Sequence, residues 1–218
     1  MLPRSLKLLA LSLLLAAGPA GASLSEPAEP PSSYRSGSAG LHFLDDLDTG
    51  ISLLPVEDGV VWLHLSVKHR TLSVVRGRHV IHEIPHFAIG INGADNLRMR
   101  GSAMTPKGEF RVERINPNSQ YIAFIAINYP NPRVADQALS EGLITFEEAE
   151  RIRRHYQQNR LSYPHTALGG NIGIHGLGNR DPFLNRRIDW TDGCLAIENE
   201  QVRLLSSLVG INTPVLIQ

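Results

Sequence analysis

Two stretches decide how this sequence is interpreted: Gly169-Gly170-Asn171-Ile172-Gly173-Ile174-His175-Gly176 and Trp190-Thr191-Asp192-Gly193-Cys194-Leu195. The first ends an apolar, strand-like run on a histidine, and the second places the only cysteine directly after a glycine. An inert cysteine usually lies inside an apolar run, where it packs like a small hydrophobic residue. A glycine before a nucleophile instead lets the backbone approach a substrate, and consecutive N–H groups there can form an oxyanion hole. The pattern therefore leaves two interpretations of Cys194 open: a catalytic nucleophile and an inert buried thiol.

His175 is the expected partner of this thiol, because it closes a predicted strand and Gly176 follows it. An imidazole beside a thiol can raise its thiolate character or remove its proton during attack. Two states are open. In a pre-formed ion pair, the thiol pKa falls and the imidazole pKa rises, which predicts a bell-shaped window of reactivity. In a neutral pair, the resting thiol keeps an ordinary pKa.

Composition excludes several classes of protein. The 218 residues include 21 Lys+Arg and 21 Asp+Glu, so the formal charge is zero and no nucleic-acid partner is expected. The apolar share of 42% is enough for a sizeable core. A single cysteine excludes an intramolecular disulfide and any multi-cysteine metal site.

Residues 1–22 have the pattern of a secretory signal peptide. Arg4 and Lys7 precede the apolar run Leu8–Ala17, and Ala20-Gly21-Ala22 fits a cleavage site, so cleavage is expected near Ala22. No cysteine follows the apolar run, which excludes a bacterial lipoprotein anchor. The sequence thus predicts an exported protein with no stable membrane anchor after cleavage, the alternative being a short uncleaved anchor.

Residues 23–40 are dominated by Ser, Pro, Gly and Ala and predict a flexible tether, because few large apolar side chains are present. Apolar residues recur from Leu41 onward, and no later linker is evident. Residues 41–218 are therefore expected to form a single domain.

Hydrophobic patterning predicts a mainly β domain with a few peripheral α-helices. One hairpin is expected to turn at Arg76-Gly77-Arg78. The expected strands cover residues 60–67, 71–75, 79–84, 107–115, 121–127, 171–175 and 215–217.

Two helices are expected. In the first, Thr145 and Glu148 form a capping box, and one stripe carries Phe146, Ala149, Ile152 and Tyr156. In the second, Asn199 is the expected N-cap of a helix that carries Val202, Leu205 and Val209 and ends at Gly210.

Two motifs are rejected as functional signals. His82-Glu83-Ile84-Pro85-His86 has the HExxH spacing of zinc proteases, but that motif requires a helix, and Pro85 and the flanking residues favour a strand. Gly176-Leu177-Gly178-Asn179-Arg180-Asp181 lacks the third glycine and the βαβ context of a dinucleotide-binding loop. No metal and no organic cofactor is expected.

Around His175 and Cys194 the sequence resembles the L,D-transpeptidase catalytic domain, or YkuD domain. His175-Gly176, a spacer of 14 residues, and Thr191-Asp192-Gly193-Cys194-Leu195 match that family's motif. Thr105-Pro106-Lys107-Gly108-Glu109-Phe110 is similar to its TPxGxF element. The resemblance covers about residues 60–218 and implies a β-sandwich or barrel. Two departures stand out: Asp192 replaces the usual histidine, and Ala196 stands where many members have Asn or Arg. A branch with a Trp-Thr-x-Gly-Cys-x-Ala motif, which includes enzymes acting on peptidoglycan-linked lipoproteins, is most similar.

The resemblance implies a periplasmic cysteine acyltransferase that cross-links or remodels the cell wall and so affects cell shape. Cys194 would attack the third residue of a peptidoglycan tetrapeptide stem and release D-alanine as a thioester forms. His175 would be the proton donor and acceptor, and the backbone at Gly193 and Cys194 would steady the oxyanion. Substrate binding or support would fall to Thr191, Asp192, Gly176 and an arginine among Arg180, Arg186 and Arg187.

The acyl acceptor is open: a stem amine, a lysine of a peptidoglycan-linked lipoprotein, or water. With water the protein is an L,D-carboxypeptidase or amidase. A non-catalytic peptidoglycan-binding module is the alternative from another class.

Overall fold

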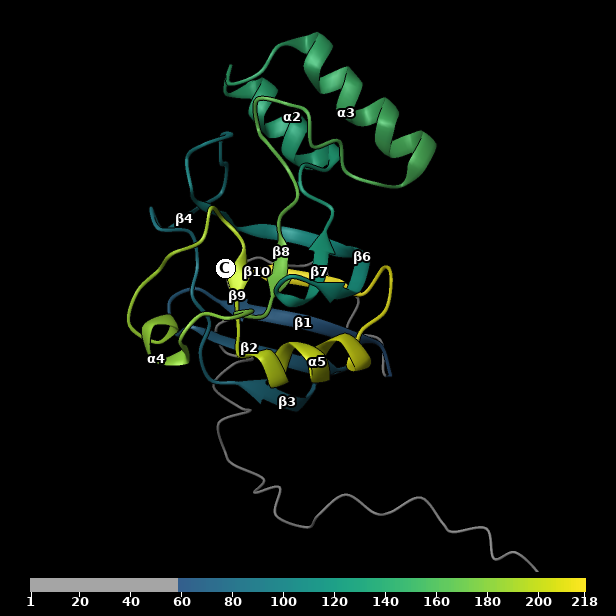
Figure 1. Ribbon diagram of the computed structural model, residues 1–218. Helices are drawn as coiled ribbons and strands as arrows, with labels where there is room; N and C mark the ends of the chain where they lie inside the picture. Colours follow the sequence, from purple (N-terminus) through teal and green to yellow (C-terminus); the bar gives the residue numbers. More distant parts are fainter. Residues whose placement is uncertain (1–58) are drawn as a thin grey trace, which may run out of the picture. The chain divides into compact units, whose positions relative to one another are not determined.

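A computed structural model describes residues 59–218 of this chain, and the element labels follow Figure 1. The predicted signal peptide (1–22), the predicted tether (23–40) and the first part of the expected domain (41–58) lie outside the described residues. The division of the chain at these boundaries stays a prediction.

The first three strands, each expected from the sequence, form a meander. They are β1 (Val61–Ser66), β2 (Thr71–Arg76) and β3 (His79–Ile84), paired antiparallel in chain order. Gly77 lies in the turn between β2 and β3 with a φ of +58°, a left-handed conformation that glycine adopts without steric cost. The hairpin expected at residues 76–78 is confirmed.

The sheet has the order β3-β2-β1-β10-β6-β7-β8-β9. β6 (Gly108–Ser119) is its longest strand and changes partner along its length. Residues 108–111 of β6 pair with β10 (Pro214–Ile217), whereas residues 112–119 pair with β7 (Ile122–Ile127), with register shifts along the β7 side. A strand that changes partner in this way joins two half-sheets, which is how sandwiches turn their corners.

A short pairing brings the two ends of the sheet together. Ala88, which follows β3, exchanges backbone hydrogen bonds of 3.0 and 2.8 Å with Ala196 in β9 (Leu195–Ala196). Gly90 forms a further bridge to Thr191. The mainly β fold predicted from the sequence is confirmed, and this pairing explains its barrel-like character. The remaining strands are β4 (Ala94–Asp95), β5 (Thr105–Pro106) and β8 (Gly173–His175).

The core is built from alternate residues of the strands, as period-2 burial requires. Its members include pairs two residues apart on five strands: Leu63 and Leu65, Leu72 and Val74, Phe110 and Val112, Ile125 and Ile127, Val215 and Ile217. Each such side chain contributes about 1.5–3 kcal/mol when fully buried. Helix α5 (Asn199–Leu208) adds Val202 and Leu205 to the same cluster and contacts β6, β7 and β8.

Helices α2 (Pro132–Ser140) and α3 (Phe146–Asn159) pack against each other and lie together beyond the β6–β7 part of the sheet (Figure 1). The side chain of Thr145 caps α3 as predicted, accepting from the Glu148 N–H at 3.2 Å. The Glu148 carboxylate instead accepts from the Ala167 N–H. Phe146 was expected in the buried stripe of α3, but it is 63% exposed. Only Ala149 and Ile152 of this helix are buried.

The sequence patterning did not predict α2, nor the short helix α4 (Pro182–Asn185), both of which begin at a proline. Within residues 59–218, no helix is long and apolar enough to cross a membrane.

Candidate active site

The parallel pairing of β8 with β9 places the two predicted catalytic residues on one face of the sheet. Ile174 lies opposite Leu195 and His175 opposite Ala196, which places Cys194 beside the start of β8. Ile174 and Leu195 are both fully buried in the core cluster. Because side chains alternate between the faces of a strand, His175 and Cys194 both project from the opposite face. Residues far apart in sequence thereby line one cleft.

The imidazole of His175 is held in one orientation and one tautomer. Its Nδ1 lies 2.7 Å from the carbonyl oxygen of Gly176, and a carbonyl only accepts, so Nδ1 carries the hydrogen. Nε2 of the neutral ring is then free to accept a proton. Tyr121 lies against the ring at a centroid distance of 4.4 Å, and Trp190 meets it edge-on at 5.8 Å. Burial lowers the His175 pKa, although the Gly176 hydrogen bond works in the opposite direction.

The thiol of Cys194 is half-buried, with its Sγ 3.6 Å from the carbonyl oxygen of Asn171. Burial raises its pKa to about 11. The Gly173 N–H and the Arg98 charge partly oppose that rise, whereas Asp192 adds to it. A raised thiol pKa and a lowered His175 pKa both disfavour an ion pair. The structure therefore favours a neutral thiol and a neutral imidazole, but the thiol pKa is raised, not ordinary as the neutral-pair alternative predicted.

The loop before Cys194 is held by Thr191, as its predicted supporting role requires. The Thr191 hydroxyl donates to the Cys194 carbonyl oxygen at 2.6 Å and accepts from the Gly193 N–H at 3.1 Å. The Gly193 N–H is thus already engaged, which contradicts the oxyanion role expected for it in the resting loop. Gly193 is required for another reason: its φ is +126°, and a Cβ there would lie 2.5 Å from the Met104 carbonyl oxygen.

Gly176 lies in the chain that leaves the histidine, and Asn199 holds this segment. A Cβ on Gly176 would lie 2.5 Å from the Tyr121 carbonyl oxygen and 2.8 Å from the Asn199 Oδ1, which explains the glycine. The same Oδ1 accepts from the N–H groups of Leu177 and Gly178, at 2.8 and 3.1 Å, and its Nδ2 donates to the Gly178 carbonyl. The expected N-cap role of Asn199 is therefore wrong. Glu198 is the N-cap of α5, and Asn199 supports the site.

A bidentate ion pair that the sequence analysis did not identify anchors the loop on its other side. Both guanidinium Nη atoms of Arg70 lie 2.6 Å from the two carboxylate oxygens of Asp189. The Ile89 N–H also donates to Asp189. Burial opposes ionisation of this carboxyl, but these hydrogen bonds outweigh it and lower the Asp189 pKa. The β1–β2 turn is thus tied to the residue before Trp190.

The cleft has a volume of about 660 Å³. Its lining includes His175, Cys194, Thr191 and Asp192, together with residues from the β6–β7 hairpin. Of the three arginines considered, only Arg180 lines the cleft, with its guanidinium 4.0 Å above the Trp190 ring. A second lining arginine, Arg114 on β6, was missed because nothing in its local sequence marks it.

Arg186 and Arg187 do not line the cleft, contrary to the expectation for substrate binding. Arg186 forms an ion pair with Glu198, and Arg187 lies over the Phe183 ring at 4.2 Å. The first contact joins the end of α4 to the start of α5, and the second lies within the segment around α4.

The HExxH stretch has the geometry of a strand, as predicted. His82 and Glu83 belong to β3, so they point to opposite faces of the sheet, and the His86 Nε2 lies 3.0 Å from the Asn185 carbonyl oxygen. Across residues 59–218, no group of three or more His, Cys, Asp or Glu side chains is placed to hold a metal ion.

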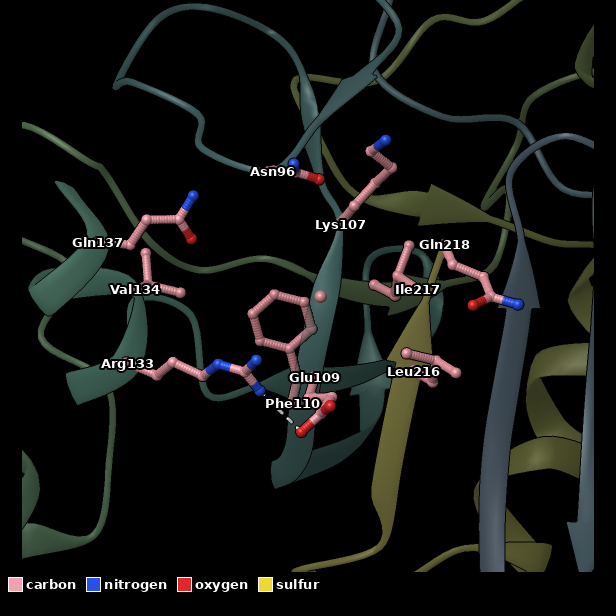
Figure 2. A pocket seen from close by; sticks show the side chains of 11 residues that line it. Asn96, Lys107, Glu109, Phe110, Arg133, Val134, Gln137, Leu216, Ile217 and Gln218 are labelled. Carbon is pink, nitrogen blue, oxygen red and sulfur yellow. Dashed lines mark ion pairs between the residues drawn. The ribbon is translucent and has the colours of Figure 1, made fainter. Parts of the chain in front are cut away.

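Figure 2 shows a second, smaller cavity of about 350 Å³, between α2, β6 and β10. Phe110, Val134 and Leu216 give it apolar walls, and a 2.9 Å ion pair joins Arg133 to Glu109 beside them. It shares no lining residue with the cleft at Cys194.

Comparison with solved structures gives relatives at low identity. The helical cell shape determining protein Pgp2 from Campylobacter jejuni is 20% identical (TM-score 0.48), and Bd1075 from Bdellovibrio bacteriovorus is 21% identical (TM-score 0.45). Each match covers 74% of this chain and 48% of the other, so the chain spans about half their length. An L,D-transpeptidase from Xylanimonas cellulosilytica is 15% identical (TM-score 0.43), over 81% of this chain and 69% of that one.

No curated protein matches the sequence significantly. The L,D-transpeptidase catalytic domain (YkuD), by contrast, matches residues 60–217, which include every strand from β1 to β10 and both His175 and Cys194. That match spans well over half of the chain, and this protein therefore belongs to the L,D-transpeptidase catalytic-domain family.

Proposed function

We propose that this protein is a cysteine acyltransferase that acts on peptidoglycan stem peptides, with Cys194 as nucleophile and His175 as proton acceptor and donor. One observation carries the proposal: the β8–β9 register projects both side chains from one sheet face into one cleft, while Gly176 leaves His175 Nε2 free to accept a proton. Thioester formation requires a nucleophilic thiol and a base that accepts its proton, and both lie on this face.

The reaction begins with a neutral thiol. As Sγ of Cys194 bonds to the carbonyl carbon of the third stem residue, its proton passes to Nε2 of His175. The resulting imidazolium returns that proton to the amine of D-alanine as the C–N bond breaks, leaving a thioester on Cys194. An amine or water then attacks the thioester and releases the thiol.

The Cys194 N–H is the oxyanion donor in this proposal. The neighbouring Gly193 N–H is taken by Thr191, and the Cys194 N–H has no acceptor within the described part of the chain. A donor fixed by the backbone stabilises the charge that develops in the transition state without reorganising. Thr191 holds this donor in place through the Cys194 carbonyl.

Two arginines make the cleft suitable for an anionic peptide. Arg114 and Arg180 both line it, and guanidinium groups bind carboxylates with two hydrogen bonds. Stem peptides carry free carboxylates at the third residue and at the terminal D-alanine. The substrate lies outside the cytoplasmic membrane, so the proposal requires export to the periplasm, which residues 1–22 would direct.

The test uses purified protein and sacculi, with the muropeptides identified by mass spectrometry. Cross-linking predicts new dimers joined through third residues, whereas hydrolysis predicts tripeptide stems without new dimers. A lipoprotein-linking activity requires an added lysine-bearing acceptor protein. Muropeptides unchanged by wild type under all three conditions would reject the proposal.

The control is Cys194→Ala, a small change at a half-buried position that should leave the melting temperature close to that of wild type. Turnover should fall by at least about a thousandfold, because the nucleophile is absent. Intact mass after incubation with a carbapenem gives a second readout, since only the wild type should gain the adduct. Residual turnover within tenfold of wild type would remove Cys194 from the mechanism.

A further inference from the structure

The side chain of Arg98 is buried directly beneath the loop that carries Cys194. Arg98 comes from the segment between β4 and β5 and is 5% exposed. Its Nη1 would lie 2.9 Å from a Cβ on Gly193, and its Cζ would lie 3.3 Å away. The guanidinium therefore fills the space that a side chain at position 193 would need.

Arg98 lacks the partners that a buried arginine normally has. Its Nε is buried and has no hydrogen-bond partner within residues 59–218, and Nη2 makes only a 3.4 Å contact with the Met99 carbonyl oxygen. None of the ion pairs formed by the described residues involves Arg98. A buried charge without an ion-pair partner costs stability.

Burial lowers the Arg98 pKa, and two of the groups whose charge acts on Arg98 belong to the candidate active site. Cys194 and Asp192 interact with it favourably, as does the Tyr129 phenol, whereas Arg100 opposes it. Asp192 is exposed and lines the cleft with His175, Arg114 and Arg180. When Cys194 loses its proton, the resulting negative charge adds to that of Asp192 and further stabilises the Arg98 cation.

We propose that Arg98 is a positioning residue for the thiol chemistry: its buried guanidinium, packed under Gly193, stabilises negative charge on Cys194. The inference rests on the proposed nucleophilic role of Cys194 and adds an electrostatic partner to it. Asp192 works in the opposite sense on the cleft side of the loop. The thiol therefore interacts with a buried cation that favours its ionisation and with an exposed carboxylate that disfavours it.

Alkylation by iodoacetamide tests this directly, because Cys194 is the only thiol in the chain. Sγ displaces iodide and forms an S–C bond, and the thiol proton goes to solvent, so the rate follows the thiolate fraction. At about pH 8, Arg98→Met should react about tenfold more slowly than wild type, whereas Arg98→Lys, which keeps the charge, should stay close to wild type. Asp192→Asn should react several-fold faster. Arg203→Met, on the exposed surface of α5, is the matched control and should match wild type.

The melting temperature separates this role from a structural one. If Arg98 only supports the fold, Arg98→Met should melt at a lower temperature or fail to fold. If its charge serves the thiol, removal of an unpaired buried cation should leave the melting temperature equal or higher. An unfolded Arg98→Met, or a folded one that reacts at the wild-type rate, overturns the inference.

The assay needs no peptidoglycan, so the two proposals can fail separately. Slow alkylation of Arg98→Met in a protein that never processes stem peptides would retain the role of Arg98 and reject the proposed substrate. Normal alkylation of Arg98→Met in a protein that does process them would reject the role of Arg98 alone.

Discussion

The resting thiol of Cys194 should be almost entirely protonated at neutral pH. Its pKa is raised from 9.0 to about 11 by burial, and burial also lowers the His175 pKa from 6.5. In an ion pair the shifts would have the opposite signs. The experiment is a pH titration of the folded protein, compared with His175→Ala and with the same chain in denaturant.

The size of the effect follows from the thiol pKa. A rise from 9.0 to about 11 leaves roughly a hundredfold less thiolate at any pH well below both values. A thiolate of higher pKa is also a better nucleophile, which recovers about a factor of 10 over two units. The net expectation is that folded Cys194 reacts with iodoacetamide about tenfold more slowly than the unfolded chain.

The assay measures the alkylation rate constant between about pH 6 and pH 9.5, a range below the expected thiol pKa. The rate should rise about tenfold per pH unit without reaching a plateau. His175→Ala should follow the same line, because a neutral imidazole does not hold a thiolate. Turnover, by contrast, should fall in acid as His175 takes up a proton and stops accepting one.

A plateau of alkylation below about pH 8 in wild type would refute this reasoning, because it would reveal a thiolate formed at rest. Loss of that plateau in His175→Ala would identify the ion pair as its cause. The neutral-pair interpretation would then have to be abandoned, although the nucleophilic role of Cys194 would stand.

Two further predictions concern the frame of the site. Gly193→Ala should lose activity and about 1–3 kcal/mol of stability, because its φ of +126° is strained for alanine and its Cβ would collide with Arg98. Gly210→Ala is the control and should match wild type, because a Cβ at that position has no atom within 4 Å. Chemical denaturation and muropeptide turnover measure both variants, and an active Gly193→Ala would contradict the packing argument. Asn199→Ala should lose about 1–3 kcal/mol and lower kcat more than it changes KM, because it releases the segment after His175. An unchanged kcat would restrict Asn199 to a structural role.

Local patterning in the sequence was sufficient for much of the fold. The meander of β1, β2 and β3 follows from β-branched alternation around a glycine turn, and α3 follows from a threonine cap and a helical stripe. These signals act over a few residues, where backbone sterics and hydrogen bonding dominate. The short strands β4, β5 and β9 have only two residues each and are defined by their partners, so no local pattern could mark them.

The hydrogen-bond partners of the expected helix caps could not be predicted from the local sequence. Asn199 has the residue type of an N-cap, but its amide binds the chain after His175, and Glu198 caps α5 instead. Both uses satisfy backbone N–H groups, and the choice depends on a segment brought close by the β8–β9 pairing. In the same way, Glu148 has the spacing of a capping box but accepts from Ala167.

The mainly β class, the family and the two candidate catalytic side chains could all be inferred from the sequence, because each depends on a pattern of residues within a short segment of the chain. The protonation of those side chains, by contrast, depends on contacts that form only in the folded protein. Arg98, Arg114 and Asp189 come from distant segments and carry no local signature, yet they surround the cleft or anchor its loop. The pKa values of Cys194 and His175 depend on burial and on charges across the fold, and burial exists only once the strands have paired.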